Sequence, residues 1–461
     1  MMQSISDVSL EMPSLEVVLE VLTLRSGINT AIVVLGTCCL GIASGIIGTF
    51  ALLRKRSMMG DALAHATLPG LAIAFILSTV WLGMEGKSLP VLLAGAIVSA
   101  IVAVIVVQLL VKYTRLKEDT AIGAVLSVFF GCGVVLMSAI QYLETGSEGG
   151  LHHFIYGQTA AMSISDACLI AVVAVVIALI TASFLKEFRL ICFDADYATV
   201  QGWPVSSLDL LMMALVMLVV VVGLSSVGML LVIALLIIPA SAARFWTERL
   251  NMMIIISALI GGLSCYLGAS ASALFPRMPA GAIIVLTSGC FFAVSFGLAP
   301  KRGVLASLVG LVREQKRVSE DHLLRRMFEF LESEGVVVDA YKPIPLKHLR
   351  IYRSSSSVLR WIVPTMLSLR GLVIFDWKTI AFTPKGLQMA KKLTINHRLW
   401  EEYLISYAHL SSARVDWSAD IVEHIMSDEL VARLKNALRQ KGVLLADAED
   451  LTSVHPLKCL S

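Results

Sequence analysis

Residues 207–240 read SLDLLMMALVMLVVVVGLSSVGMLLVIALLIIPA, the longest apolar run of the chain. A membrane-crossing helix needs about 20 mostly apolar residues. The run is therefore long enough for two crossings, and Ser225, Ser226 and Gly228 offer the only break for a tight turn between them. Further candidate spans lie near 28–53, 62–83, 89–111, 120–142, 164–184, 251–270 and 279–298. The pattern predicts an all-α polytopic membrane protein with about nine spans, or eight if the long run crosses once.

Composition supports a membrane protein. Hydrophobic residues make up 57% of the chain, charged residues only 15%, and the mean hydropathy is +0.82. Soluble domains contain roughly 25% charged residues, so much of the chain is expected in a bilayer. The eight cysteines lie mostly in apolar segments and form no CxxC pair, which favours small core residues over a disulfide framework.

The basic links between spans predict the orientation. Lysine and arginine mark the cytoplasmic side of a membrane protein, and an odd number of spans places the basic links on one side. The amino end is then outside and the carboxyl half is cytoplasmic. The basic links are residues 54–56, 112–117, 186–189, 244–249 and 301–302.

The segment GDALAHA, residues 60–66, places ionisable groups at the start of a span. Asp61 and His65 are four residues apart, so one helical face presents a carboxylate and an imidazole. Ionisable residues inside spans are costly and usually functional, and this pair can coordinate a divalent cation in passing. Asp61 as a helix cap, with His65 bonded to nearby backbone, is the structural alternative.

A second segment, FDADYATVQGWP at 193–204, predicts a short cytoplasmic helix before the sixth span. Asp194 or Asp196 can cap its start, and it ends at Gly202. A partner protein could move the adjoining spans through such a helix, although an ordinary interfacial helix fits the same pattern.

Beyond residue 303 the chain becomes polar. Residues 304–318 are expected to be a linker and 446–461 a tail. An apolar stripe from Leu323 to Leu331 indicates a helix, and 345–351 and 355–370 predict two shorter ones. Residues 372–375 and 379–383 predict a two-stranded wing, and a long helix follows from Pro384 to about Ala408. The pattern is helix–helix–wing, with further helices to about residue 445.

This polar half contains a strongly basic segment. Between Lys342 and Arg398 there are eleven Lys and Arg residues and one acid, Asp376. The imbalance fits phosphate contacts on a DNA duplex; contact with anionic lipid is the alternative.

Metal-ligand spacing recurs in the same half. His397 and Glu401 share a helical face, and so do Asp420, Glu423 and His424. Carboxylate and imidazole donors suit Mn²⁺ or Fe²⁺ as well as Zn²⁺. His322 can supply a further ligand.

The amino-terminal motifs together resemble the zinc, manganese and iron ABC-importer permeases. They are LRKRSMMGDALAHATLPG at 53–70, KEDTAIG at 117–123, FDADYATVQG at 193–202 and IIPASAAR at 237–244. The resemblance implies a vitamin-B12-importer-type permease over residues 1–303, a second permease subunit, a cytoplasmic ATPase and an external metal-binding protein. Asp61 and His65 would line the translocation path. Asp194, Asp196, Ala198 and Gly202 would belong to the helix that couples to the ATPase.

The motifs FTPKG at 382–386, HRLWE at 397–401 and EHIMSDE at 423–429 resemble the diphtheria-toxin-repressor family of metal-dependent repressors. The resemblance implies a winged helix-turn-helix domain at 319–385 and metal-binding and dimerisation helices at 386–445. His397 and Glu401 would form one metal site, with Asp416 where family members usually have histidine. His322, Asp420, Glu423 and His424 would form the other. Operator contacts would fall to Arg353, Ser356, Arg360 and Lys378, although Pro364 is expected to kink or restart the recognition helix.

The whole chain resembles the permease–repressor fusions of chlamydial-type metal uptake systems. This resemblance implies an importer subunit for iron, manganese or zinc at the bacterial inner membrane, with a metal-dependent repressor domain at its carboxyl end. A second hypothesis is that the carboxyl half only inhibits transport when metal binds, without DNA. Because the chain has no GxxxxGK[ST] phosphate loop, a separate subunit must hydrolyse ATP. A transporter driven by an electrochemical gradient would need no such partner.

Overall fold

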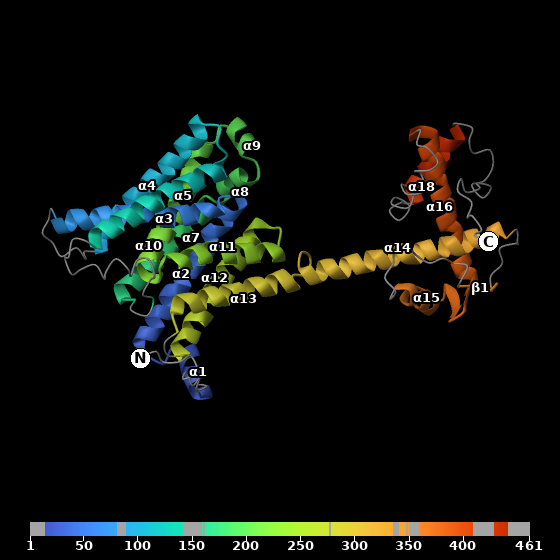
Figure 1. Cartoon of the computed structure of the whole chain (residues 1–461), viewed down its shortest axis with the longest axis horizontal. Helices are drawn as coiled ribbons and strands as arrows, with labels where there is room; N and C mark the ends of the chain where they lie inside the picture. Colours follow the sequence, from blue (N-terminus) through green and yellow to red (C-terminus); the bar gives the residue numbers. More distant parts are fainter. Residues whose placement is uncertain are drawn as a thin grey trace. The chain divides into compact units, whose positions relative to one another are not determined.

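The computed structural model describes residues 14–80, 89–141, 159, 162–275, 278–334, 341–346, 349, 359–408 and 428–440. The chain divides into two compact units, Met1–Ser307 and Leu308–Ser461 (Figure 1). Each unit has its own buried apolar core, and each is described by itself.

Nine helices in the described residues of the first unit are long and apolar enough to cross a membrane, as predicted. Three shorter helices accompany them: α1 (Leu15–Leu22), α8 (Leu185–Phe193) and α9 (Ala195–Val200). The nine are α2 (Ile28–Leu53), α3 (Ser57–Val80), α4 (Leu89–Tyr113), α5 (Glu118–Gln141), α7 (Ile164–Ser183), α10 (Val205–Val227), α11 (Met229–Trp246), α12 (Leu250–Leu274) and α13 (Ala280–Leu298).

The long apolar run divides into α10 and α11 at Gly228, whose φ of +85° ends the first helix. A Cβ atom on Gly223 would lie 2.6 Å from Cγ2 of Val232. In one continuous helix these positions would be about 13.5 Å apart, at 1.5 Å per residue. The chain therefore reverses here, which confirms two helices. The predicted break was too wide, because Ser225 and Ser226 still belong to α10.

Helix α2 packs closely against its neighbours through small residues. A Cβ atom on Gly41 would collide with the Gly261 carbonyl oxygen, and one on Gly48 would collide with that of Leu236. Ser257 donates a hydrogen bond to the Gly45 carbonyl at 2.7 Å. Small residues and interhelical hydrogen bonds are what hold helices together in lipid.

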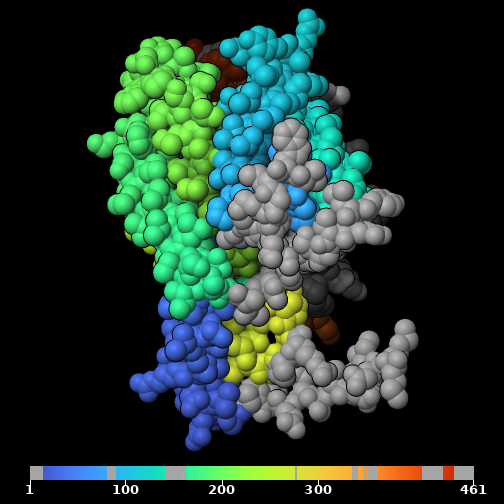
Figure 2. All heavy atoms as spheres, turned by 90° about the vertical axis from the view of Figure 1, so that its left-hand side faces the viewer, coloured from blue at the N-terminus to red at the C-terminus, as the bar shows by residue number. Residues whose placement is uncertain are grey.

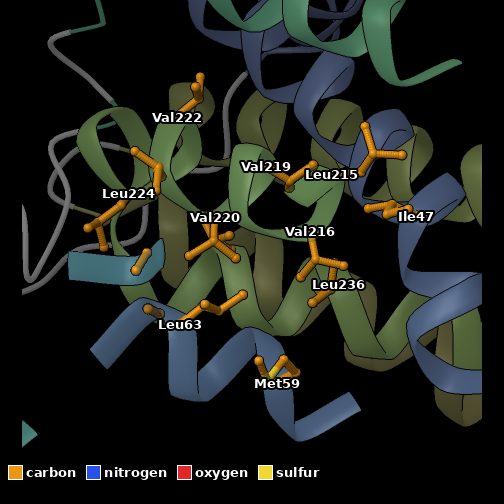
Figure 3. Close-up of a cluster of buried hydrophobic side chains, with 14 of the residues drawn as sticks. Ile47, Met59, Leu63, Leu215, Val216, Val219, Val220, Val222, Leu224 and Leu236 are labelled. Atoms are coloured by element: carbon orange, nitrogen blue, oxygen red, sulfur yellow. The ribbon is translucent and has the colours of Figure 1, made fainter. Parts of the chain in front are cut away.

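One face of α3 lies against α10 and α11. Figure 3 shows Met59 and Leu63 of α3 beside Val216 and Val220 of α10 and Leu236 of α11. Met59 and Leu63 are buried. At 100° per residue, Asp61 and His65 point away from this apolar contact. The packing thus assigns the two ionisable residues to a different face of α3.

The amino-terminal helix is joined to α12. The Tyr266 hydroxyl donates a hydrogen bond to the Leu22 carbonyl at the end of α1. Figure 2 shows this blue amino-terminal segment beside the yellow region where α12 and α13 meet. The long-range hydrogen bond holds α1 on the helical unit.

Helix α14 (Val304–Ser333) contains the division between the units, and the predicted linker 304–318 forms its first half. The second unit continues with β1 (Ile344–Pro345), α15 (Leu359–Leu369), β2 (Val373–Asp376), β3 (Thr379–Phe382), α16 (Pro384–Ala408) and α18 (Asp428–Gln440).

The strands form one antiparallel sheet in the order β1-β3-β2. Val373 pairs with Phe382, and Ile344 pairs with Ile380. The predicted hairpin is therefore present, but a third strand lies on its other edge. The helix expected over 345–351 is wrong at its start, because Pro345 belongs to β1. Backbone pairing with β3 is available to Ile344 and Pro345, and it outweighs their local pattern.

Two local features fix the elements around the sheet. Helix α15 runs through Pro364 as a single helix, so of the two expected effects of this proline, a kink or a restart, the restart does not occur. At the start of α16 the Gly386 N–H donates to the Thr383 side chain at 3.1 Å. A Cβ atom on Gly386 would collide with the Leu372 carbonyl oxygen. Only glycine lets the helix begin so close to the strand.

Candidate functional site

Asp61 and His65 form an interacting pair on α3, as their spacing predicts. His65 Nε2 lies 3.4 Å from Asp61 Oδ1. The Asp61 side chain is 35% exposed and the His65 side chain 19%. Asp61 lies within α3 and not before it, so it is no helix cap. The pair is partly accessible, as a transient cation ligand must be.

The surroundings of His65 leave donor capacity for an ion. Its ring meets Phe130 of α5 edge to face at 4.9 Å, and its Nδ1 atom is buried without a hydrogen-bond partner among the described residues. Pro69 has no N–H, so the usual helical donor to the His65 carbonyl is missing. The Nδ1 atom of His65 thus has no hydrogen-bond partner in this part of the structure, and the His65 carbonyl oxygen lacks its usual helical donor.

A buried ion network lies at one end of α3. Arg54 Nη2 and Arg56 Nη1 contact the same Asp209 carboxylate oxygen at 2.8 and 3.0 Å. Arg56 also pairs with Glu118 at the start of α5, and Arg54 donates to the Ile191 carbonyl of α8 at 3.2 Å. The network joins α2, α3, α5, α8 and α10. Sequence reasoning missed it, although Asp209, an ionisable residue inside a predicted span, was a signal.

A cavity of about 540 Å³ opens beside this network. It brings Arg56, Glu118 and Asp209 next to Thr199 of α9 and Trp203 behind it. The α8 residue Cys192 lies in the same region, where burial raises the pKa of its thiol to about 12 against the lowering effect of Arg54. The network and the cavity therefore extend from the start of α3 to α9.

Helix α9 is built as predicted. The Asp194 carboxylate accepts a hydrogen bond from the Tyr197 N–H at 2.9 Å and caps the helix. Asp196 is exposed, Ala198 is fully buried, and Gly202 follows the end of the helix with φ +82°. Three large apolar residues along the segment are exposed: Phe193 is 65%, Tyr197 51% and Val200 86% exposed.

The second unit brings His397 and Glu401 together on α16. His397 Nε2 lies 3.3 Å from Glu401 Oε1, and the side chains are 2% and 1% exposed. Neither carboxylate oxygen of Glu401 accepts a hydrogen bond within the described residues. Burial and the donor types fit a cation, but a protein cation is already present, because Arg325 Nη1 of α14 lies 2.6 Å from His397 Nδ1.

Within the described residues no three His, Cys, Asp or Glu side chains form a metal-holding group. His322 is half-buried on α14 and makes no such group with the α16 pair. The four other expected ligands, Asp416, Asp420, Glu423 and His424, lie outside the described residues.

The expected DNA contacts are described only in part. Arg353 and Ser356 lie outside the described residues. Arg360 lies in α15, and Lys378 is exposed in the β2–β3 turn. Acids of α14, and Glu334 just after it, offset part of the basic segment: Arg370 pairs with Glu320, Arg398 with Glu332, and Lys342 with Glu334.

Two family matches cover most of the chain. Residues 28–299 match the ABC 3 transport family. Residues 383–441 match the iron-dependent repressor metal-binding and dimerisation domain. The first match contains the spans with Asp61 and His65, and the second contains the α16 pair.

Two of three curated relatives match more of the chain than the membrane unit. The manganese transport system membrane protein MntC of Bacillus subtilis is 37% identical over 388 residues, covering 84% of this chain and 87% of that protein. The zinc transport system membrane protein TroC of Treponema pallidum is 41% identical over 288 residues, covering 61% and 95%. A Chlamydia trachomatis protein named "probable metal transport system membrane protein" is 26% identical over 410 residues, covering 86% and 90%.

A solved structure shares the fold of the membrane unit. PsaBC from Streptococcus pneumoniae, in complex with Fab, superposes with a TM-score of 0.53 and 32% identity. The match covers 62% of this chain and 96% of that one.

Proposed function

The chain belongs to the ABC 3 transport family, and from this premise we propose that it conducts Mn²⁺ or a closely related divalent ion and binds the same ion with its second unit. It is a multi-pass membrane permease subunit and not itself an ATPase. The named substrates of its relatives, manganese and zinc, support a divalent cargo; Fe²⁺ accepts the same donors.

One observation carries the transport proposal: the Asp61–His65 pair on the α3 face turned away from the apolar contact with α10 and α11. A carboxylate and an imidazole bind Mn²⁺, Fe²⁺ or Zn²⁺. A pair is an incomplete coordination shell, so the ion keeps water ligands and leaves again. Conduction needs binding of this moderate strength.

We propose that α9 receives the ATPase. Its exposed Phe193, Tyr197 and Val200 offer an apolar surface to a partner. A displacement of α9 would be transmitted to Asp209 across the shared cavity. The ion pair between Asp209 and Arg56 would then transmit it to the start of α3. A second permease subunit, the same or different, and an external binding protein complete the importer.

The second unit carries a repressor-type metal-binding and dimerisation domain. We propose that His397, Glu401 and Asp416 form one metal site, and that Asp420, Glu423 and His424, with His322, form the other. The dimerisation domain supports self-association of the chain. The occupancy of these sites would then depend on the concentration of the ion that the membrane unit imports.

We further propose that this unit binds operator DNA. The three-stranded sheet, α15 and the exposed Lys378 support a winged helix. The alternative, metal-dependent inhibition of transport without DNA, makes an opposite prediction. Glu423→Gln with His424→Ala deregulates transcription and leaves uptake unchanged if the unit is a repressor; it deregulates uptake alone if the unit is only an inhibitor.

Uptake by reconstituted complexes tests the transport proposal. The full chain, with its ATPase and binding protein in lipid vesicles, is supplied with ATP and radioactive Mn²⁺. Asp61→Asn or His65→Ala is expected to reduce uptake at least about tenfold, because an intramembrane ion ligand is lost. Glu248→Gln is the matched control, because Glu248 is 67% exposed and pairs only with a surface arginine in the described contacts. Unchanged uptake in both pore variants would reject the pathway.

A further inference from the structure

Arg325 of α14 contacts one ring nitrogen of His397, and Glu401 faces the other. Its Nη1 atom lies 2.6 Å from His397 Nδ1, and its Nε atom lies 3.5 Å from Glu329 Oε1 one turn along α14. Arg325 is only 5% exposed, comparable to the two α16 residues. An arginine, an imidazole and two carboxylates thus form one largely buried cluster.

The protons in this cluster can be assigned from chemistry. Arginine stays charged in proteins and only donates hydrogen bonds. His397 Nδ1 must therefore accept from the guanidinium, so a neutral ring carries its proton on Nε2, which faces Glu401 at 3.3 Å. One ring nitrogen then has its lone pair occupied and the other holds a proton. A metal ligand histidine needs a free lone pair on a neutral ring.

Charge gives a second reason for competition. The guanidinium supplies the positive charge that the buried Glu401 and the half-buried Glu329 carboxylates require, because an uncompensated buried charge is strongly unfavourable. A divalent ion at His397 and Glu401 would supply two positive charges, where the guanidinium supplies one. The two cations compete because they repel each other across one ring. A metal ion on Nε2, beside Glu401, would also force the ring proton onto Nδ1, where it would meet the guanidinium, which can only donate.

We propose that Arg325 is a built-in competitor for metal at the His397–Glu401 half-site. The inference rests on the proposed metal-binding function of the second unit. A divalent ion gains this pair only after the guanidinium withdraws, so Arg325 raises the metal concentration at which the site fills. When the competent state is a fraction of the population, the apparent dissociation constant rises by the inverse of that fraction.

Metal titration of the full chain tests the proposal. The protein is placed in lipid nanodiscs and carries Asp61→Asn and His65→Ala to silence the pore. Free Mn²⁺ is followed by its electron paramagnetic resonance signal. Arg325→Met, which keeps the volume and removes the charge, is expected to tighten binding at one site at least about tenfold. Arg433→Met is the matched control, since Arg433 is 76% exposed on α18.

The dependence on His397 separates competition from a general structural effect. Adding His397→Ala to Arg325→Met should abolish the gain. Unchanged or weakened binding in folded Arg325→Met would overturn the proposal. If that variant does not fold, Arg325→Lys replaces it; its single ammonium cannot span His397 and Glu329, so a smaller gain is expected, and no gain overturns the proposal.

A further variant separates failure of the Arg325 competitor from failure of the proposed metal-binding function. Glu423→Gln with His424→Ala removes expected ligands without touching Arg325. If this change lowers Mn²⁺ binding while Arg325→Met has no effect, the metal-binding function stands and the competitor is rejected. If neither Glu423, His424 nor His397 affects binding, the metal-binding function and the competitor both fall.

Discussion

At the residue scale, a few buried charges explain most of the site. Asp209 lies within a span and is only 8% exposed, yet it receives two guanidinium groups, from Arg54 and Arg56. A buried carboxylate without such partners would cost several kcal/mol. The pairing makes the charge tolerable and ties four helices to α3, so the network is a connection as well as a stabilising contact.

The pKa of the Cys192 thiol provides a test of how deeply this region is buried. Burial raises its pKa to about 12, whereas an unperturbed thiol has a pKa near 8.5. Because the thiolate is the reactive form, alkylation of the folded chain should keep rising about tenfold per pH unit up to pH ~10. In chain unfolded by a denaturing detergent, the rate at the same residue should level off above pH ~8.5. Mass spectrometry of the Cys192 peptide measures both profiles; a folded profile that also levels off near pH ~8.5 would contradict the buried network.

At the element scale, the contacts of α2 determine how closely the spans approach. Gly48→Ala forces a methyl group against the Leu236 carbonyl oxygen, a backbone atom that cannot turn aside. Overpacking of this kind costs about 1–3 kcal/mol. We expect the unfolding temperature in detergent to fall clearly. Size-exclusion chromatography of heated samples measures it.

Gly123→Ala is the control for this substitution. Gly123 lies in α5, and a methyl group added there would have no atom of the described residues within 4 Å, so it meets open space. The variant should unfold at or slightly above the wild-type temperature, because alanine favours helix over glycine by about 0.5–1 kcal/mol. Equal destabilisation by both substitutions would show that α2 does not make the close contact.

The sequence predicted elements well where the signal is local. Apolar length found the nine spans, and the i, i+4 spacing placed Asp61 with His65 and His397 with Glu401. Long-range contacts were out of reach: β1 forms because β3 lies beside it, and Arg325 meets His397 from a helix 72 residues earlier. No local pattern encodes either contact. The metal ligands and the DNA contacts all stay predictions.

At the scale of the whole molecule, one polypeptide joins a permease to a metal-binding and dimerisation domain. The fusion fixes one such domain to each permease subunit, so the two are made in equal amounts, whether or not the domain acts as the proposed sensor. If two copies assemble around one pathway, the dimerisation domains are supplied in the same pairwise ratio. We therefore expect an importer built on two copies of this chain to carry a matched pair of sensors.

The most direct measurement of this account is the number of Mn²⁺ ions bound at equilibrium by the full chain in nanodiscs. The account predicts that Asp61→Asn with His65→Ala leaves the two proposed sites of the second unit, and that adding Glu423→Gln and His424→Ala removes one of them. Retention of every site after all four substitutions would contradict the claim that a single chain both passes and senses its ion.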